Sequence, residues 1–388
     1  MFVPYARQSI NEDDISAVAD VLRSEFLTQG PTVPAFENAI ADYCKANYAV
    51  AMNSATSALH VACLALGVGP DDFVWTSPIS FVASANCAIY CGAQVDFVDI
   101  DAKTFNMSVD ALATKLAQAK LANKLPKVVI PVHLGGQSCD MATIYSLSQT
   151  YGFKIIEDAS HAIGGTYRGE PVGSCVFSDV TVLSFHPVKI ITSGEGGMAL
   201  TNDAALAESM TQIRTHGITR DAHLYENATD GPWYYEQINL GFNYRLTDIA
   251  AALGLSQFQR INSFVAKRNE IALNYDMLFT DTAITTPIIT SDAMSSFHLY
   301  IIQLPLLNSQ KQKFFEIARN NSVGLNVHYI PIYRHPYFSK MGFKSNDFPK
   351  AEKYYSEAIS IPMYADLSFD QQQHVASVLI STAATVIQ

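Results

Sequence analysis

The chain has 388 residues, of which 49% are hydrophobic and 16% are charged, a composition too apolar for a disordered protein. Its net charge of −11 argues against a nucleic-acid partner, because binding to a phosphate backbone needs clustered Lys and Arg. No apolar run is long enough to cross a bilayer, and the first residues lack the apolar segment of a signal peptide. We therefore expect a cytoplasmic protein with no membrane partner.

In the first half of the chain, apolar segments rich in β-forming residues alternate with helical patterns. The apolar segments are FVWTSP near 73, AQVDFVDI near 93, KVVIPVHL near 127, FKIIED near 153 and VTVLSF near 180. This alternation is typical of the α/β class. It predicts a mostly parallel sheet that is covered by helices on both faces.

The middle of the chain contains a long polar segment, residues 215–238, followed by a helical pattern over residues 246–279. The polar segment is aperiodic and predicts a long loop, and loops of this length usually have a function. The helical stretch is predicted to link a large domain to a smaller α+β domain. We expect the large domain to cover residues 1–250 and the small domain to cover residues 251–388.

The C-terminal part combines strand and helix patterns. It predicts a strand (FHLYIIQL), a helix (KQKFFEIARN), a second strand (LNVHYIPI) and two further helices. The last helix opens with Ser368 and Gln371, which have the spacing of a capping box.

Several common ligand-binding motifs do not occur in the sequence. No G-x-G-x-x-G follows a strand, and there is no P-loop, no H-E-x-x-H, no Cys/His zinc pattern and no C-x-x-C pair among the six cysteines. Nicotinamide, nucleoside-triphosphate and zinc chemistry therefore lose support, and no metal site is predicted. In open parallel sheets, ligands collect at the carboxyl ends of strands, so polar residues directly after an apolar run are the candidates for function.

Four places meet this condition. The segment NSATSALH, residues 53–60, opens a helix with hydroxyls and backbone N–H groups that suit a phosphate. Asp158 ends the strand in IIEDASH, where a carboxylate can cap a helix, bind a metal or pair with a protonated ring nitrogen. Lys189 is flanked by apolar residues, and poor solvation lowers the pKa of an amine and favours Schiff-base chemistry. Phe81 follows a strand and could stack on a planar cofactor.

Each of these four features also has a plain structural explanation. The helix start and Asp158 could be ordinary caps, Lys189 could extend to solvent from a strand end, and Phe81 could belong to the core. Together, however, they provide a phosphate site, an acid for a ring nitrogen, an imine-forming lysine and a stacking ring. A pyridoxal-phosphate site requires these same parts.

At these residues the chain resembles the DegT/StrS family of pyridoxal-phosphate sugar aminotransferases, which have the type I, aspartate-aminotransferase-like fold. The shared motifs are NSATSALH, EDASHA, SFHPVKIITSGEGG, LGFNYRLTDIAAALG, SFHLY and AEKYYSEAISIPMY, and they span nearly the whole chain in family order. The resemblance implies pyridoxal 5′-phosphate as the cofactor and a homodimer as the active form.

The resemblance also implies roles for individual residues. Lys189 would carry the Schiff base to the cofactor, Asp158 would pair with the pyridine nitrogen and His161 would lie near the ring hydroxyl. The other expected cofactor contacts are Thr56, Ser57 and Ser184 at the phosphate, Phe81 against the ring, and Asn243, which would reach the cofactor of the other subunit.

Within the family, the segments VPYARQSI, SEFLTQGP and NVHYIPIYRHPYF are most similar to the PseC type, the transaminases of pseudaminic acid biosynthesis. These enzymes move the amino group of L-glutamate to C4 of a UDP-linked 2-acetamido-2,6-dideoxy-4-hexulose and release 2-oxoglutarate. The similarity would place the following residues around the nucleotide sugar: Tyr5, Glu25, Phe26, Leu27, Thr28, Asn326, Val327, His328 and Tyr329.

Two segments differ from the residues that are usual at these positions in the family. Asp71-Asp72-Phe73 is expected to be a surface turn, whereas Gly135-Gly136-Gln137 could alter the sugar pocket. On the long loop, Trp233, Tyr234 and Tyr235 need a covering surface, which a second subunit would supply.

Alternatives to this assignment remain at two levels. For the substrate, they are the D-gluco-configured UDP sugar and dTDP-linked 4-keto sugars. A sugar dehydratase of the same fold would have histidine in place of Lys189. A cofactor-bearing regulator would need an added DNA-binding segment or a basic face. The sequence therefore favours an aminotransferase over both.

Overall fold

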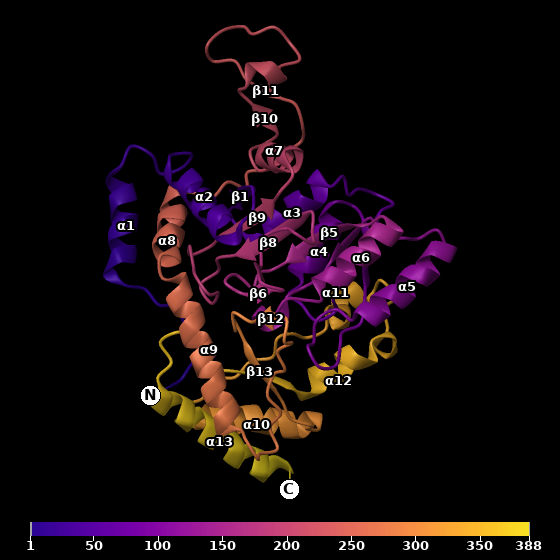
Figure 1. Cartoon of the computed structure of the whole chain (residues 1–388), viewed down its shortest axis with the longest axis vertical. Helices are drawn as coiled ribbons and strands as arrows, with labels where there is room; N and C mark the ends of the chain where they lie inside the picture. Colours follow the sequence, from indigo (N-terminus) through magenta and orange to yellow (C-terminus); the bar gives the residue numbers. More distant parts are fainter. Residues whose placement is uncertain (1, 388) are drawn as a thin grey trace.

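A seven-stranded sheet organises the larger part of this computed structural model, which describes residues 2–387 (Figure 1). The spatial order of the strands is β1-β9-β8-β5-β4-β2-β3. β9 runs antiparallel to both neighbours, and the strands from β8 to β3 are parallel to one another. The predicted α/β fold with a mostly parallel sheet is confirmed. The strands are β1 (Tyr48–Met52), β2 (Phe73–Thr76), β3 (Gln94–Phe97), β4 (Val128–Ile130), β5 (Lys154–Asp158), β8 (Val180–Ser184) and β9 (Gly197–Thr201).

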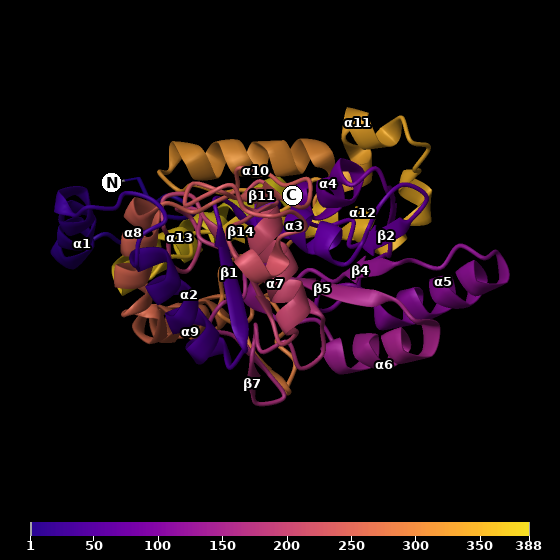
Figure 2. The same cartoon turned by 90° about the horizontal axis from the view of Figure 1, so that it is seen from above.

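Helices cover both faces of the sheet, because successive side chains of a strand point to opposite sides. Ile156 of β5 packs in one core with α3 (Ala55–Ala65), α4 (Ala83–Tyr90) and α7 (Ala204–Ile213). Its neighbour Ile155 packs on the other face with α5 (Val109–Leu121) and α6 (Met141–Tyr151), and α2 (Thr32–Cys44) covers the same face beside β8. Figure 2 shows α3 and α4 on one side of the strands and α5 and α6 on the other.

A second core lies beyond the sheet. It is built from α9 (Ile261–Leu278), α10 (Asn308–Asn320), α13 (Phe369–Ile387) and the antiparallel pair of β13 (Tyr300–Gln303) and β14 (Ala358–Ile361). Val3 packs into this second core. Tyr354 of α12 (Pro349–Glu357) packs instead into the core that Ile156 shares with α3, α4 and α7. The chain thus crosses between the two cores more than once, and a division at residue 250 stays a prediction.

The remaining elements surround these two cores. The predicted helical stretch before residue 280 is two helices, since α8 (Asp248–Phe258) ends just before α9 begins. Within residues 2–387, no helix combines the length and apolarity that a bilayer crossing requires. The other elements are α1 (Glu12–Arg23), α11 (Pro336–Ser339), the three-stranded sheet of β6 (Thr166–Tyr167), β7 (Glu170–Pro171) and β12 (Ala293–Met294), and the paired strands β10 (Ile218–Thr219) and β11 (Glu236–Gln237).

The predicted long loop forms an arm that projects from the body of the molecule at β10 and β11 (Figure 1). On this arm, Trp233 is 73% exposed and Tyr235 is 50% exposed. Exposed apolar side chains that lie together often mark a surface that a partner covers.

The C-terminal elements confirm one sequence expectation and correct another. The capping box before α13 is present, because Ser368 N–H donates to Gln371 and Gln371 N–H donates to the Ser368 hydroxyl. The predicted strand over residues 325–332 is wrong, since only Asn326 forms a β-bridge there. The side chain of Asn326 accepts the N–H of Val327 at 2.8 Å, and such a local bond competes with strand pairing.

One close backbone contact fixes the start of α3 against the sheet. A Cβ added to Gly197, the first residue of β9, would lie 2.3 Å from the backbone nitrogen of Ala55. We expect Gly197→Ala to lower the free energy of unfolding by about 1–3 kcal/mol, because the backbone must move to relieve the overlap. Gly69→Ala is the matched control, since a Cβ there meets nothing within 4 Å, and it should change stability by less than about 0.5 kcal/mol. Urea unfolding measures both, and equal losses would contradict the close-contact explanation.

Candidate functional site

A cavity of about 790 Å³ opens where β1, β5 and β8 end. Its size lies within the range of sites for small ligands and cofactors. Asp158 and Ser184 are the last residues of β5 and β8, and Asn53 directly follows β1. The predicted site residues that line this cavity are Tyr5, Thr56, Ser57, Phe81, Asp158, His161, Ser184, Lys189, His328 and Tyr329.

The N-terminus of α3 forms one wall of the cavity and suits an anion. Ser54 caps this helix by accepting the N–H of Ser57 at 3.1 Å, and Asn53 accepts the Ser57 hydroxyl at 2.6 Å. Among residues 2–387, no acceptor is recorded for the backbone N–H groups of Ala55 and Thr56. These two donors and the positive end of the helix dipole can therefore hold a phosphate.

Asp158 is a buried carboxylate with one acceptor position left for a ligand. Its Oδ1 accepts the backbone N–H of Ser160 at 3.2 Å and the Ser160 hydroxyl at 2.6 Å. Its Oδ2 accepts the Ser84 hydroxyl at 2.6 Å. A carboxylate has about four acceptor positions, so the remaining one on Oδ2 can receive a hydrogen bond from the cavity.

Lys189 lies in the turn after β8 and reaches the same cavity. Part of its surface faces the cavity, but protein atoms surround the ammonium group and few waters can solvate it. Burial therefore lowers the pKa of Lys189 to about 8, and the negative charge of Asp158 offsets only part of this effect. At neutral pH a useful fraction of this amine is uncharged and nucleophilic.

Three histidines lie near Lys189 and are kept neutral by their surroundings. Burial lowers the pKa of His161 and of His298 well below the usual value, and the positive charge of Lys189 lowers both further. Burial also lowers the pKa of His328 to about 4. The His161 and His298 rings are 4.4 Å apart at their centroids, and the Tyr329 hydroxyl lies 3.0 Å from Nε2 of His161.

Several predicted site residues lie outside the cavity lining. The segment of residues 25–28 is exposed between α1 and α2, where Leu27 accepts the N–H of Asp248 and Thr28 bridges Thr247. Asn326 and Val327 do not line the cavity, although His328 does. The side-chain nitrogen of Asn326 lies 3.4 Å from Nε2 of His328. The roles expected for these residues stay predictions.

Asn243 also lies outside the cavity lining of its own chain. It lies near the base of the arm, where it bridges Thr215, and its carbonyl accepts the side-chain amide of Asn53 at 3.4 Å. The role expected for Asn243 at the cofactor of another subunit stays a prediction.

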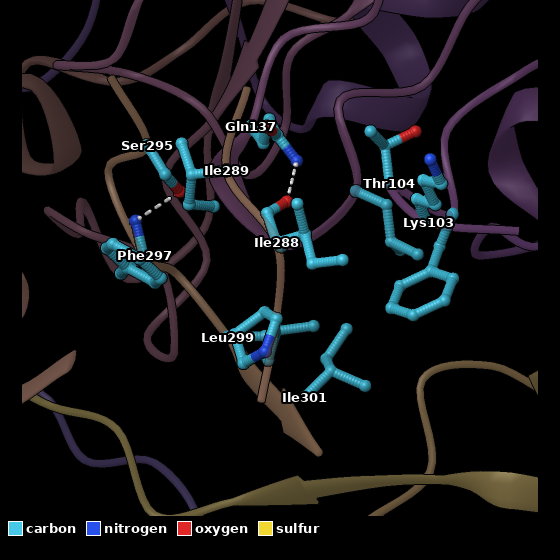
Figure 3. A pocket seen from close by; sticks show the side chains of 13 residues that line it. Lys103, Thr104, Gln137, Ile288, Ile289, Ser295, Phe297, Leu299 and Ile301 are labelled. Carbon is cyan, nitrogen blue, oxygen red and sulfur yellow. Dashed lines mark hydrogen bonds between the residues drawn. The ribbon is translucent and has the colours of Figure 1, made fainter. Parts of the chain in front are cut away.

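The segment Gly135-Gly136-Gln137 lies away from the main cavity wall. Gln137 donates to the Ile288 carbonyl at 3.1 Å and accepts the N–H of Thr290 at 2.7 Å, beside a small separate pocket (Figure 3). None of the three residues lines the main cavity, but Gly135 N–H donates to the His161 ring at 3.3 Å. The expectation that this segment alters the sugar pocket stays a prediction.

The sequence argument did not single out the two serines that hold Asp158. Ser160 had a signal, because a hydroxyl two residues after an aspartate commonly closes a local turn. Ser84 had none, since it lies 74 residues from Asp158 in the chain. Ser54, His186 and Glu195 also line the cavity and were not predicted as site residues.

The residues present fit pyridoxal phosphate. The N-terminus of α3 offers unpaired donors for the phosphate, and Asp158 has one acceptor position for a protonated ring nitrogen. Lys189 is an amine of lowered pKa in the same cavity and suits the aldehyde carbon. No single one of these features would be specific, but together they match the polar groups of this cofactor.

Comparison with known proteins agrees with this fit. The sequence matches the DegT/DnrJ/EryC1/StrS aminotransferase family over residues 8–380. It is 37% identical to spore coat polysaccharide biosynthesis protein SpsC of Bacillus subtilis (strain 168) over 379 residues, 96% of this chain and 95% of that protein. It is 35% identical to the UDP-4-amino-4,6-dideoxy-N-acetyl-beta-L-altrosamine transaminase of Campylobacter jejuni subsp. jejuni serotype O:23/36 (strain 81-176) over 381 residues, 98% of this chain and 97% of that protein.

Solved structures share the same fold over the full length. The PLP form of Spr1654 from Streptococcus pneumoniae superposes with a TM-score of 0.91 at 28% sequence identity, and the match covers 100% of both chains. The chain belongs to the DegT/DnrJ/EryC1/StrS aminotransferase family and is a pyridoxal-phosphate-dependent sugar aminotransferase.

Proposed function

We propose that this enzyme moves the amino group of L-glutamate to C4 of a UDP-linked 4-keto-6-deoxy-N-acetylhexosamine, in nucleotide-sugar biosynthesis of the pseudaminic acid type. The observation that carries the chemistry is the desolvated amine of Lys189 in one cavity with the Asp158 carboxylate. The substrate is supported by the Campylobacter relative, whose name specifies a 4-amino-4,6-dideoxy-N-acetyl sugar on UDP.

The protein residues have separate tasks in this proposal. Pyridoxal phosphate, when bound, supplies an electron-accepting ring and carries the amino group between the two substrates. Lys189 would hold the cofactor through its Nζ, and the same amine, when free, would move a proton between the substrate and the cofactor. Asp158 Oδ2 would accept the hydrogen bond of a protonated pyridine nitrogen, and Ser84 and Ser160 hold this carboxylate in position. The phosphate would be bound by Thr56, Ser57 and Ser184. Phe81 would pack against the face of the cofactor ring.

The sugar would enter beside Tyr5, His328 and Tyr329, which line the cavity from the N-terminus and from the segment before α11. The Tyr5 and His328 rings are 5.5 Å apart at their centroids and are tilted by 47°. Aromatic faces of this kind suit a sugar ring or a pyrimidine base. A dTDP-linked 4-keto sugar and the D-gluco-configured UDP sugar are the alternatives.

A homodimer with shared sites completes the proposal. The arm exposes Trp233 and Tyr235, which a second subunit would cover, and Asn243 at its base contributes nothing to the cavity of its own chain. In a symmetric dimer, each arm would reach the other subunit, and each active site would contain Lys189 from one chain and Asn243 from its partner.

Subunit complementation tests this shared site. Lys189→Ala and Asn243→Ala chains are co-expressed with different tags, and activity is compared with that of each variant alone. If the sites are shared, mixed dimers contain one intact site, and random pairing gives about a quarter of the wild-type activity. No recovery above the mean of the separate variants, or a fully active monomer in light scattering, would rule the shared site out.

A half-reaction panel tests the substrate. The enzyme is loaded with pyridoxamine phosphate, each 4-keto sugar is added separately, and the return of the pyridoxal-form absorbance is followed. We expect the UDP-linked L-configured 4-keto sugar to react fastest, and Lys189→Ala loaded in the same way should fail to turn over. A faster reaction with a dTDP sugar would contradict the UDP assignment, and no reaction with any keto sugar would contradict the function.

A further inference from the structure

Two packed helices outside the cavity carry a cluster of three cysteines and one histidine. His60 and Cys63 lie one turn apart on α3, and Cys87 lies one turn before Cys91, the residue at which α4 ends. Residues three or four apart share one face of a helix, and α3 packs directly against α4. None of the four residues lines the main cavity, so the reactivity of this cluster does not depend on the proposed function.

Cys91 differs from the other cysteines in its exposure. Five of the six cysteines are buried, and within the described residues only Cys91 is partly exposed. The buried Cys63 thiol lies within hydrogen-bonding reach of both the Cys87 and the Cys91 thiols. A dissolved oxidant can therefore reach one sulfur of a cluster whose other sulfurs are shielded from solvent.

The groups around Cys91 favour its thiolate. The pKa of Cys91 is lowered to about 6, first by the Cys63 thiol, which donates a hydrogen bond, and then by the His60 ring, although burial acts in the opposite direction. Cys63 itself stays protonated, because its hydrogen bonds to Cys87 and Cys91 and its burial raise its pKa well above the usual value. At neutral pH Cys91 is mostly a thiolate, the form of cysteine that reacts with oxidants.

The surroundings of His60 support the same assignment. The ring is 4% exposed, and its Nδ1 lies 3.4 Å from the Tyr244 hydroxyl. Its Nε2 is buried, and no hydrogen-bond partner is recorded for it among residues 2–387. A buried ring nitrogen without a partner costs free energy, and a thiolate at Cys91 would give it an acceptor.

Cys63 is the partner that a disulfide to Cys91 requires. Cys87 and Cys91 are four residues apart on one helix, where Cβ atoms are about 5–6 Å apart, whereas a disulfide needs about 3.5–4.5 Å. Cys63 instead approaches Cys91 from the neighbouring helix. We propose that Cys91 is a site of reversible thiol oxidation, at which a peroxide joins Cys91 and Cys63 in a disulfide between α3 and α4.

The reaction has two steps and consumes one molecule of hydrogen peroxide. The Cys91 thiolate attacks a peroxide oxygen, an S–O bond forms, the O–O bond breaks, and the departing hydroxide takes up a proton to become water. The Cys63 sulfur then attacks the Cys91 sulfur, an S–S bond forms, the S–O bond breaks, and the hydroxyl leaves as water with the Cys63 proton. Both sulfurs are oxidised and the peroxide is reduced, and a dithiol reverses the change by exchange.

Peptide mass mapping of the peroxide-treated holoenzyme tests the pair. At pH 7 we expect a link between Cys63 and Cys91 that dithiothreitol removes, and no link at this place in Cys91→Ser. Cys44 and Cys175 are the matched control within the same chain, because they are neighbouring thiols whose pKa values are raised by burial, and they should stay reduced. The absence of a link to Cys91, or a link between Cys44 and Cys175 that forms equally fast, would overturn the proposal.

Cys63→Ser separates the two roles of Cys63. Serine keeps a donor for the Cys91 thiolate but cannot form a disulfide, so peroxide should leave a sulfenic acid on Cys91 that dimedone traps. No dimedone adduct in a variant that circular dichroism shows to be folded would count against the proposal.

The pH dependence of iodoacetamide labelling of the reduced wild-type holoenzyme provides a second readout. Labelling of Cys91 should reach half its maximal rate near pH 6, more than two units below an ordinary thiol with a pKa of about 8.5. A midpoint at pH 8 or above would overturn the proposal. Neither readout uses a keto sugar or turnover, so failure here would leave the proposed function standing.

Discussion

Asp158 and Lys189 face one cavity without forming an ion pair, and the chemistry of the site depends on this separation. Ser84 and Ser160 occupy the carboxylate, and none of the salt bridges within residues 2–387 joins it to Lys189. A paired lysine would be stabilised as a cation and would keep a high pKa. Left in surroundings that solvate it poorly, Lys189 is instead a nucleophile near neutral pH.

The edge of the sheet and the irregular segment over residues 325–332 both line the same cavity. The ends of β5 and β8 and the start of α3 provide Asp158, Ser184 and the phosphate donors. The irregular segment over residues 325–332 provides His328 and Tyr329 side by side. In a strand, two successive side chains would point to opposite faces, so the irregular backbone allows both to face the cavity. Ser360 of β14 fixes the His328 ring by a contact of 2.8 Å.

The sequence predicted the features that follow from local pattern and from the geometry of parallel strands. Residues that directly follow buried strands meet at one edge of the sheet, which is why the sequence alone could place Asp158, Lys189 and the start of α3 together. The sequence could not predict features that depend on contacts between distant residues. The Ser84 bond to Asp158, the bond from Gly135 that orients His161, and the loss of the strand over residues 325–332 are of this kind.

The central claim is that desolvation makes Lys189 reactive, and the pH dependence of cofactor capture by the cofactor-free enzyme tests it most directly. Only the uncharged amine attacks the aldehyde, so the capture rate should rise about tenfold per pH unit and level off near the pKa of Lys189, about 8. Borohydride reduction and peptide mass mapping should place the adduct on Lys189. A rate that still rises through pH 10, as for an ordinary lysine with a pKa of about 10.4, or an adduct on another lysine, would contradict the account.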